Sequence, residues 1–184
     1  MYKKINGGVI VFEIFKINLE VNMKLEFMKL PFEDKSVLYN IMQLYYYDLS
    51  EFESETDKFD INSHGLYDTK YLDHFWTEEG RYPYIAKSDG KISGFVLIRK
   101  TDPNVFAYEV SEFFVLRKYR KLKIGSFMTE NIFNIHNGHW EIRTLLNNIP
   151  AQDFWRKKVA DLTEGNYEEK MIRNNTRLAW YFNN

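Results

Sequence analysis

Residues 112–128, EFFVLRKYRKLKIGSFM, pass from an aromatic, apolar run into a cluster of cations and then into a helical pattern. The cations are Arg117, Lys118, Arg120, Lys121 and Lys123. The first turn of a helix offers unpaired backbone N–H groups and a positive dipole end, and Gly125 lets a ligand come close to the backbone. The stretch therefore predicts a strand–turn–helix unit that binds phosphate, although a solvated basic turn would show the same run of charge.

Ahead of this unit, residues 25–116 show patterns typical of strands on either side of a region with helical patterns. Residues 25–30 form an apolar run that Pro31 ends, as at the end of a short strand. Apolar residues then recur every three or four positions, which is typical of a helix: Val37, Leu38, Ile41, Met42, Leu44 and Tyr45. An acidic, aromatic stretch over 48–68 suggests short helical turns and a loop. Asp89-Gly90 predicts a hairpin turn between strands at 84–86 and 92–98, and 105–116 reads as a central strand.

After the basic turn, residues 124–136 have helical spacing, and Asn137-Gly138 ends the helix. A strand over 140–146, a helix from Pro150 to about Val159 and two strands between Tyr167 and Phe182 complete the pattern. From Lys24 the predicted order is β-α-α-β-β-β-α-β-α-β-β. The sequence therefore predicts one mixed α/β domain, with no internal repeat.

Composition excludes several classes of function. The chain has 184 residues, 45% of them hydrophobic, and a formal net charge of -1 with a pI near 6.4. This balance does not favour nucleic acid or an anionic membrane as a partner, so a phosphate site has to be local. The chain has no cysteine, which excludes disulfides, thiolate metal sites and a cysteine nucleophile and fits a reducing compartment. We therefore expect a cytoplasmic protein.

Residues 1–22 are expected to be an N-terminal extension, and 23–184 the domain itself. Glu13 and Lys16 interrupt the apolar stretch and no cleavage site of small residues follows, which argues against a signal peptide. Residues 17–21 alternate apolar and polar side chains, as in a strand. An edge strand there could pair with a second subunit, so a homodimer stays open.

The basic unit resembles the pyrophosphate loop of the GNAT N-acetyltransferase superfamily. That loop reads Arg or Gln, two residues, Gly, one residue, Gly or Ala, and the matching stretch here runs from Arg120 to Gly125. Residues 147–151, Asn-Asn-Ile-Pro-Ala, followed by Phe154 and Trp155, are similar to that family's fifth strand and following helix. Two residues depart from the family pattern. Lys123 replaces the loop's first glycine, and Trp155 stands where many members carry a tyrosine that protonates the departing thiolate.

The resemblance implies a central mixed, mostly antiparallel sheet flanked by helices and splayed between its fourth and fifth strands. It implies an N-acetyltransferase that moves an acetyl group from acetyl-CoA to a primary amine of a small molecule or peptide, by direct attack in a ternary complex. The backbone N–H of Val115 is then the donor to the thioester oxygen. Glu112 precedes the loop at a spacing often seen in the family and is the first candidate for the base, with Glu109 as the alternative. Regular alternation places the two on opposite faces, so at most one should face a given cleft unless a bulge intervenes. A surface or hydrogen-bonded strand glutamate is the plain alternative for either.

The resemblance also implies the contacts of the cofactor. Residues expected to bind it are Val115, Arg120, Lys121, Leu122, Lys123, Ile124, Gly125, Ser126, Asn147 and Phe154. The acid for the thiolate is left open between Tyr108, Tyr167 and water. An acidic group after the first helix, Glu51 to Asp60, could attract a cationic amine or be a solvated loop. We expect no metal, because the closest pair of histidines, His136 and His139, is split by a helix-ending Asn-Gly.

Two other functions compete with this one. One is a catalytically silent acyl-CoA-binding module acting as a sensor or interaction surface, which Lys123 and Trp155 favour. The other is nucleic-acid binding through the basic turn, which the balanced charge disfavours.

Overall fold

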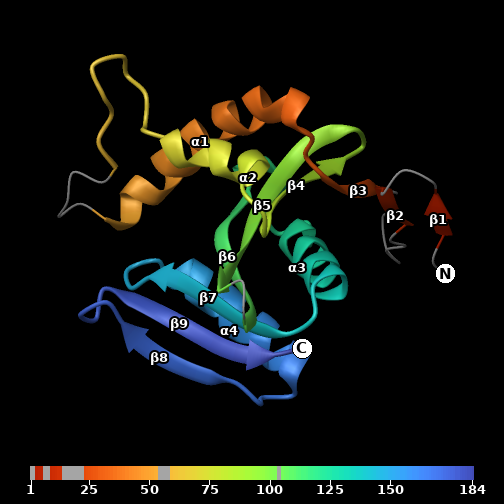
Figure 1. The fold of residues 1–184 in the computed structure, drawn as a ribbon, viewed down its shortest axis with the longest axis vertical. Helices are drawn as coiled ribbons and strands as arrows, with labels where there is room; N and C mark the ends of the chain where they lie inside the picture. Colours follow the sequence, from red (N-terminus) through yellow and green to blue (C-terminus); the bar gives the residue numbers. More distant parts are fainter. Residues whose placement is uncertain (1–2, 6–8, 14–22, 54–58, 103–104) are drawn as a thin grey trace.

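The computed structural model describes residues 3–5, 9–13, 23–53, 59–102 and 105–184. Its strands form one sheet in the order β1-β2-β3-β4-β5-β6-β7-β9-β8 (Figure 1). The strands are β1 Lys3–Ile5, β2 Val9–Glu13, β3 Lys24–Lys29, β4 Arg81–Ser88, β5 Lys91–Asp102, β6 Val105–Val115, β7 His139–Leu145, β8 Glu168–Ile172 and β9 Arg177–Asn183. All neighbouring strands are antiparallel except β6 and β7, which are parallel. The predicted mixed, mostly antiparallel sheet is confirmed, and so is the element order from Lys24.

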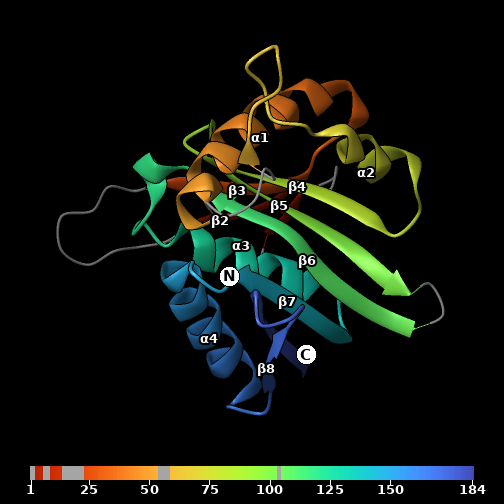
Figure 2. The same ribbon diagram turned by 90° about the vertical axis from the view of Figure 1, so that its left-hand side faces the viewer.

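Helices cover both faces of the sheet. They are α1 Lys35–Leu49, α2 His74–Thr77, α3 Ile124–Ile135 and α4 Ile149–Thr163, with 3₁₀ turns at Phe32–Asp34, Ser50–Phe52, Lys70–Asp73 and Arg117–Tyr119. In Figure 2, α1 and α2 lie above the sheet and α3 and α4 below it. The upper core joins the apolar stripe of α1 to Phe95 and Leu97, and the lower core joins α3 and α4 to Val96 and Ile98. Alternate residues of β5 thus serve opposite cores, as the period of a strand requires.

The sheet opens between β6 and β7. The two strands pair only from Ala107 with His139 to Val110 with Ile142. Beyond Val110, β6 pairs with β5 alone and β7 with β9 alone. This is the splay that was predicted between the fourth and fifth strands counted from Lys24.

A β-bulge lies where the opening begins. Leu97 of β5 faces Glu112 and Ile98 faces Val110, so Ser111 is the extra residue on β6. Such a residue shifts the alternation of side chains by one position. Glu109 and Glu112, which a regular strand would place on opposite faces, therefore point to the same face, the one covered by α1 and α2.

Residues 3–5 and 9–13 form β1 and β2, which continue the sheet beyond β3. The alternating stretch expected to form a strand, residues 17–21, lies outside the described residues. No helix among the described residues is long and apolar enough to cross a membrane.

His136 makes the lower core sensitive to pH. Its ring packs against Tyr82, Tyr108 and Trp140, and its Nε2 lies 2.9 Å from the Tyr84 hydroxyl. Burial, helped by the charges of Lys100 and Lys29, lowers the pKa of His136 from 6.5 to about 4.

Because the unfolded chain binds this proton more readily, we expect the free energy of unfolding to fall as the pH drops from 6.5 toward 4, by about 2 kcal/mol for this group. Urea unfolding at pH 7 and at pH 4.5 measures the loss. The His136→Gln variant should lose less stability over the same interval, and an equal loss in both proteins would contradict the assignment.

Candidate active site

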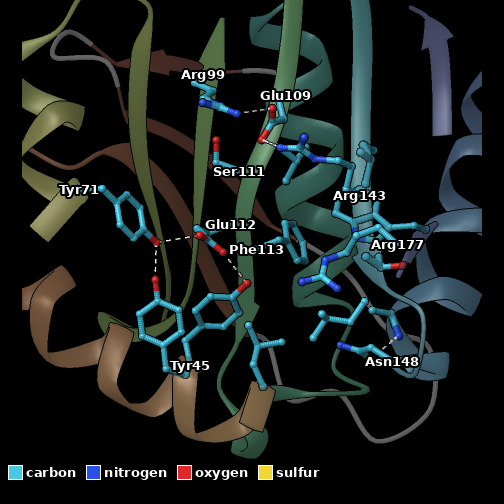
Figure 3. Close-up of a pocket in the computed structure, with 18 of the residues that line it drawn as sticks. Tyr45, Tyr71, Arg99, Glu109, Ser111, Glu112, Phe113, Arg143, Asn148 and Arg177 are labelled. Atoms are coloured by element: carbon cyan, nitrogen blue, oxygen red, sulfur yellow. Dashed lines mark hydrogen bonds and ion pairs between the residues drawn. The ribbon is translucent and has the colours of Figure 1, made fainter. Parts of the chain in front are cut away.

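A cavity of about 550 Å³ occupies the opening of the sheet. Side chains from α1, from the segment around α2, from β5 to β7 and from the start of α4 line it. Figure 3 shows Tyr45 and Tyr71 on one side of β6 and Arg143 and Arg177 on the other. Both predicted base candidates, Glu109 and Glu112, line this cavity.

Two tyrosine hydroxyls hold Glu112. Tyr45 donates a hydrogen bond to Oε2 at 2.6 Å, and Tyr71 donates one to Oε1 at 2.7 Å (Figure 3). The Tyr71 hydroxyl also lies 2.7 Å from that of Tyr46, which then acts as the donor to Tyr71. A carboxylate oxygen has two lone pairs, so a carboxylate that accepts one hydrogen bond at each oxygen can still accept a proton.

These tyrosines stay protonated at neutral pH. Burial, followed by the charge of Glu112, raises the pKa of Tyr45, Tyr46 and Tyr71 well above 10. Tyrosines of this kind serve Glu112 as hydrogen-bond donors and do not compete with it for protons.

Glu109 is held differently, by two cations. Arg99 of β5 donates to Oε2 at 2.8 Å, and Arg143 of β7 donates to Oε1. The Glu109 side chain is only 4% exposed. Because both oxygens are committed to guanidinium groups, Glu109 is suited to fixing two arginines, whereas Glu112 is held only by neutral hydroxyl groups among the hydrogen bonds described above.

The open edge of β6 presents backbone groups that have no partner strand on that side. Leu116 donates its N–H to the Ser93 carbonyl at 3.0 Å, so these residues form a hydrogen-bonded pair of the antiparallel ladder. Such pairs alternate along the strands, and Val115 and Phe113 are therefore the positions whose N–H and C=O groups point away from β5. Arg120 confirms this direction for Val115, because its Nε donates to the Val115 carbonyl at 3.1 Å. The Val115 N–H, a predicted donor, thus faces the opening.

The basic turn leads from this edge to the start of α3. Residues 117–119 form a 3₁₀ turn and Arg120 is extended, after which Ile124 begins the helix. No side chain caps the helix, so the N–H groups of Ile124, Gly125 and Ser126 have no partner within it. Lys123 adopts a left-handed conformation with φ of 63°. For a residue other than glycine this costs about 1 kcal/mol, and the departure from the family's glycine is therefore a strained one.

The cations of the turn divide into two groups. Arg117 and Arg120 both form ion pairs with Asp48 at the end of α1. In the part of the chain that the structure describes, no acidic partner is found for Lys118, Lys121 or Lys123. The two arginines thus hold the turn against α1, while the three lysines have no ion-pair partner among the described residues.

Gly125 has a packing role as well. A Cβ on it would meet the Phe154 ring at 3.0 Å, so its missing side chain lets α3 rest against α4. Phe154 also packs against Phe113 with the rings tilted and their centroids 5.6 Å apart, and Trp155 is buried against the same ring. The exposed Asn147 reaches the Phe52 carbonyl at 3.4 Å, whereas Asn148 caps α4 by accepting from the Ala151 N–H.

Most residues of the predicted cofactor site follow the chain from the open edge of β6 through the basic turn to the start of α3. None of the predicted cofactor-binding residues lines the cavity. Of the predicted set, only Glu109 and Glu112 line the cavity, while the turn, Val115, Asn147 and Phe154 do not. Tyr108 and Tyr167, considered as acids for the thiolate, do not line it either. Tyr108 instead packs against His136 and Trp140.

Several cavity residues were not identified from the sequence. Tyr45 was taken as part of the apolar stripe of α1, and a tyrosine among leucines and isoleucines was the available signal for it. The arginines of the cavity had no local signal, because β5, β7 and β9 bring them together from distant positions.

The acidic segment after α1 does not supply the cavity with carboxylates in the described residues. Glu53 pairs with Arg177 at 3.1 Å and Glu51 lies 3.8 Å from Arg117, while Asp60 is exposed. The described residues contain no group of three histidine, aspartate or glutamate side chains that could hold a metal ion.

The fold is shared with solved acetyltransferases of low sequence identity. A GNAT-family acetyltransferase from Staphylococcus aureus Mu50 aligns with a TM-score of 0.59 at 16% identity, over 86% of this chain and 98% of its own. The spermidine N-acetyltransferase of Vibrio cholerae, solved with CoA and spermine, aligns with a TM-score of 0.59 at 12% identity, over 86% and 95%. The PaiA N-acetyltransferase of Thermoplasma acidophilum, solved with coenzyme A, gives 0.57 at 13% identity, over 87% and 99%.

Sequence comparison gives the family directly. No curated protein matches the chain. The family model described as "Acetyltransferase (GNAT) family", however, matches residues 38–159, which is more than half of the sequence and spans α1 to α4. The chain belongs to the GNAT acetyltransferase family.

Proposed function

We propose that this protein is an N-acetyltransferase that moves an acetyl group from acetyl-CoA to a primary amine of a small molecule or peptide. The observation that carries the proposal is the continuous path from the open edge of β6 to the uncapped start of α3. It joins strand-like backbone donors to a phosphate-type site with three lysines that have no acidic partner among the described residues. Glu112 in the adjoining cavity completes the set of groups that amine acylation needs.

The described residues offer contacts for two parts of acetyl-CoA, its pyrophosphate and its pantetheine arm. The N–H groups of Ile124, Gly125 and Ser126, with Lys121 and Lys123, would hold the pyrophosphate. The backbone groups of Phe113 would pair with an amide of the pantetheine arm, as an added strand pairs with a sheet edge, which leaves the Val115 N–H for the thioester. Phe154 would pack beside that arm. Bound in this way, acetyl-CoA supplies the acetyl thioester.

The protein then has three tasks in the transfer. It holds the amine and the donor together in one complex. Glu112 takes a proton from the ammonium of the acceptor, and the Tyr45 and Tyr71 hydroxyls keep its carboxylate oriented. The Val115 N–H donates to the oxygen on which charge develops. No cysteine is required for direct transfer, and none is present.

A calorimetric titration with acetyl-CoA tests the donor site. Wild type should bind with micromolar affinity, and Lys123→Glu, which reverses a charge beside the helix start, should weaken binding at least about tenfold. Lys123→Gly removes the charge and relieves the positive φ, so it separates charge from strain. Lys170→Glu on the outer strand β8 is the matched control for a lysine charge reversal.

Absence of binding by folded wild type, or equal weakening by Lys170→Glu, would overturn the assignment. A Gly125→Trp variant would be less informative, because bulk at that position enters the contact with Phe154. Binding without turnover of any amine would favour the rival account, a silent acyl-CoA sensor, which the strained Lys123 and the Trp155 position support.

A further inference from the structure

The cavity beside Glu112 is rich in cationic side chains. It is lined by Arg81, Arg99, Arg143, Arg173 and Arg177, but by only three glutamates. Arg81 is neutralised by Glu78 at 2.8 Å. The positive surplus therefore belongs to the arginines nearer the opening of the sheet.

Three of these arginines form a row across the sheet. Arg99 on β5, Arg143 on β7 and Arg177 on β9 share the face that α1 and α2 cover, and Figure 3 shows Arg143 and Arg177 opposite Glu112 and its tyrosines. Arg99 and Arg143 share one carboxylate, Glu109, while Arg177 pairs with Glu53. Arg143 also lies 4.0 Å from Glu141, so the three guanidinium groups meet three carboxylates, of which only Glu109 lines the cavity. The described residues offer no acidic partner for Arg173.

The row also has spare hydrogen-bond donors. The Arg99 Nε is buried and has no hydrogen-bond partner among the described protein atoms. The hydroxyls of Ser111, on the bulge, and of Thr144, on β7, are in the same state, and both residues line the cavity. Buried donors without partners are costly, so this arrangement is what a site for a ligand with acceptor oxygens requires.

We infer that the acceptor amine carries an anionic group, a carboxylate or a phosphate, which the Arg99–Arg143–Arg177 row binds while Glu112 faces the amine. This inference rests on the proposed function and narrows its substrate class. A guanidinium presents paired donors in a plane that matches both kinds of anion. A polyamine suits the cavity poorly, because its further ammonium groups would face arginines in a partly buried setting.

Matched acceptors test the inference directly. With acetyl-CoA as donor, amino acids of increasing chain length are compared with their carboxamides, with aminoalkyl phosphates and with spermidine. The anionic member of each pair should have a kcat/KM at least about tenfold higher than the neutral one. The carboxylate and phosphate series show which anion the row prefers. Faster acetylation of the carboxamides or of spermidine would overturn the inference and leave an N-acetyltransferase.

Variants then assign the effect to the arginine row. Arg177→Gln combined with Glu53→Gln keeps the local charge balance and should raise KM for the anionic acceptor about tenfold, with little change for the carboxamide. Arg177→Lys should recover only part of the loss, because the planar fork is missing. Arg156→Gln, whose guanidinium pairs with Glu169 at 2.9 Å, is the matched control and should leave the preference unchanged.

A binding measurement separates this inference from the proposed function. Calorimetry of the anionic amines against protein saturated with CoA needs no turnover. Binding that the Arg177→Gln/Glu53→Gln variant loses would support the anion site even if no amine were acetylated, in which case only the proposed function would fail. If neither the anionic amines nor their carboxamides bound, or if both bound equally, the anion site would be refuted.

Discussion

Replacing Glu112 by Gln is expected to lower kcat/KM for amine acetylation by about 100-fold or more, with acetyl-CoA binding preserved. A positioned base contributes about 10²- to 10⁴-fold, and the amide cannot accept the proton. Gln keeps the size of the side chain, and its amide oxygen can still accept a hydrogen bond from one of Tyr45 and Tyr71 while its NH2 group donates to the other hydroxyl, so the cavity should keep its shape. Steady-state kinetics at several pH values measure the loss, and the acidic limb that the carboxylate sets should disappear.

Glu109→Gln distinguishes the two candidate bases. Its carboxylate is committed to Arg99 and Arg143, so we expect the change chiefly to destabilise the protein by leaving two guanidinium groups undercompensated. A larger loss of kcat in Glu109→Gln than in Glu112→Gln, with both proteins folded, would reverse the assignment. Tyr71→Phe should show an intermediate loss, because it removes one donor but leaves the carboxylate in place.

Replacing Val115 by Pro is expected to lower kcat by about 10²- to 10³-fold, which is the usual effect of losing one donor to a developing oxyanion. Proline deletes the N–H that faces the opening but spares the ladder to β5, in which Val115 does not donate. Val115 is the last residue of β6, and the extended Phe114 before it is compatible with a following proline. Single-turnover acetylation with saturating acetyl-CoA measures the chemical step.

Val115→Ala is the control, since it shortens the side chain and keeps the N–H. Circular dichroism and thermal unfolding should show that both variants remain folded. Equal rates in the proline and alanine variants would mean that another group stabilises the oxyanion.

The sequence was a good guide to the fold because its signals were local. The hairpin at Asp89-Gly90, the helical stripe from Val37 to Tyr45 and the end of α3 at Asn137-Gly138 all lie where residue periodicity and turn chemistry place them. The splay, by contrast, followed from the family resemblance. No local pattern indicates that two strands will part after four paired positions.

The site was less accessible from sequence, for three physical reasons. The partners of Glu112 come from α1 and from the segment before α2, and Tyr45 looks like an ordinary core residue in the helical stripe. The arginine row is assembled from three strands by their pairing in the sheet. The turn's five cations could not be divided beforehand, because the partner of Arg117 and Arg120 is Asp48, an acid far away in the sequence.

The extra residue at Ser111 determines which face of the sheet each later side chain of β6 points to. Ahead of it, the strand keeps one phase and buries Tyr108 and Val110 in the lower core. Behind it, the phase is inverted, and Glu112 joins Glu109 on the upper face. The face to which the Glu112 carboxylate points therefore depends on the number of residues between Val110 and Glu112 and not on the identity of residue 111. Deleting or inserting one residue there would move every later side chain of β6 to the opposite face of the sheet, whereas substituting residue 111 would not.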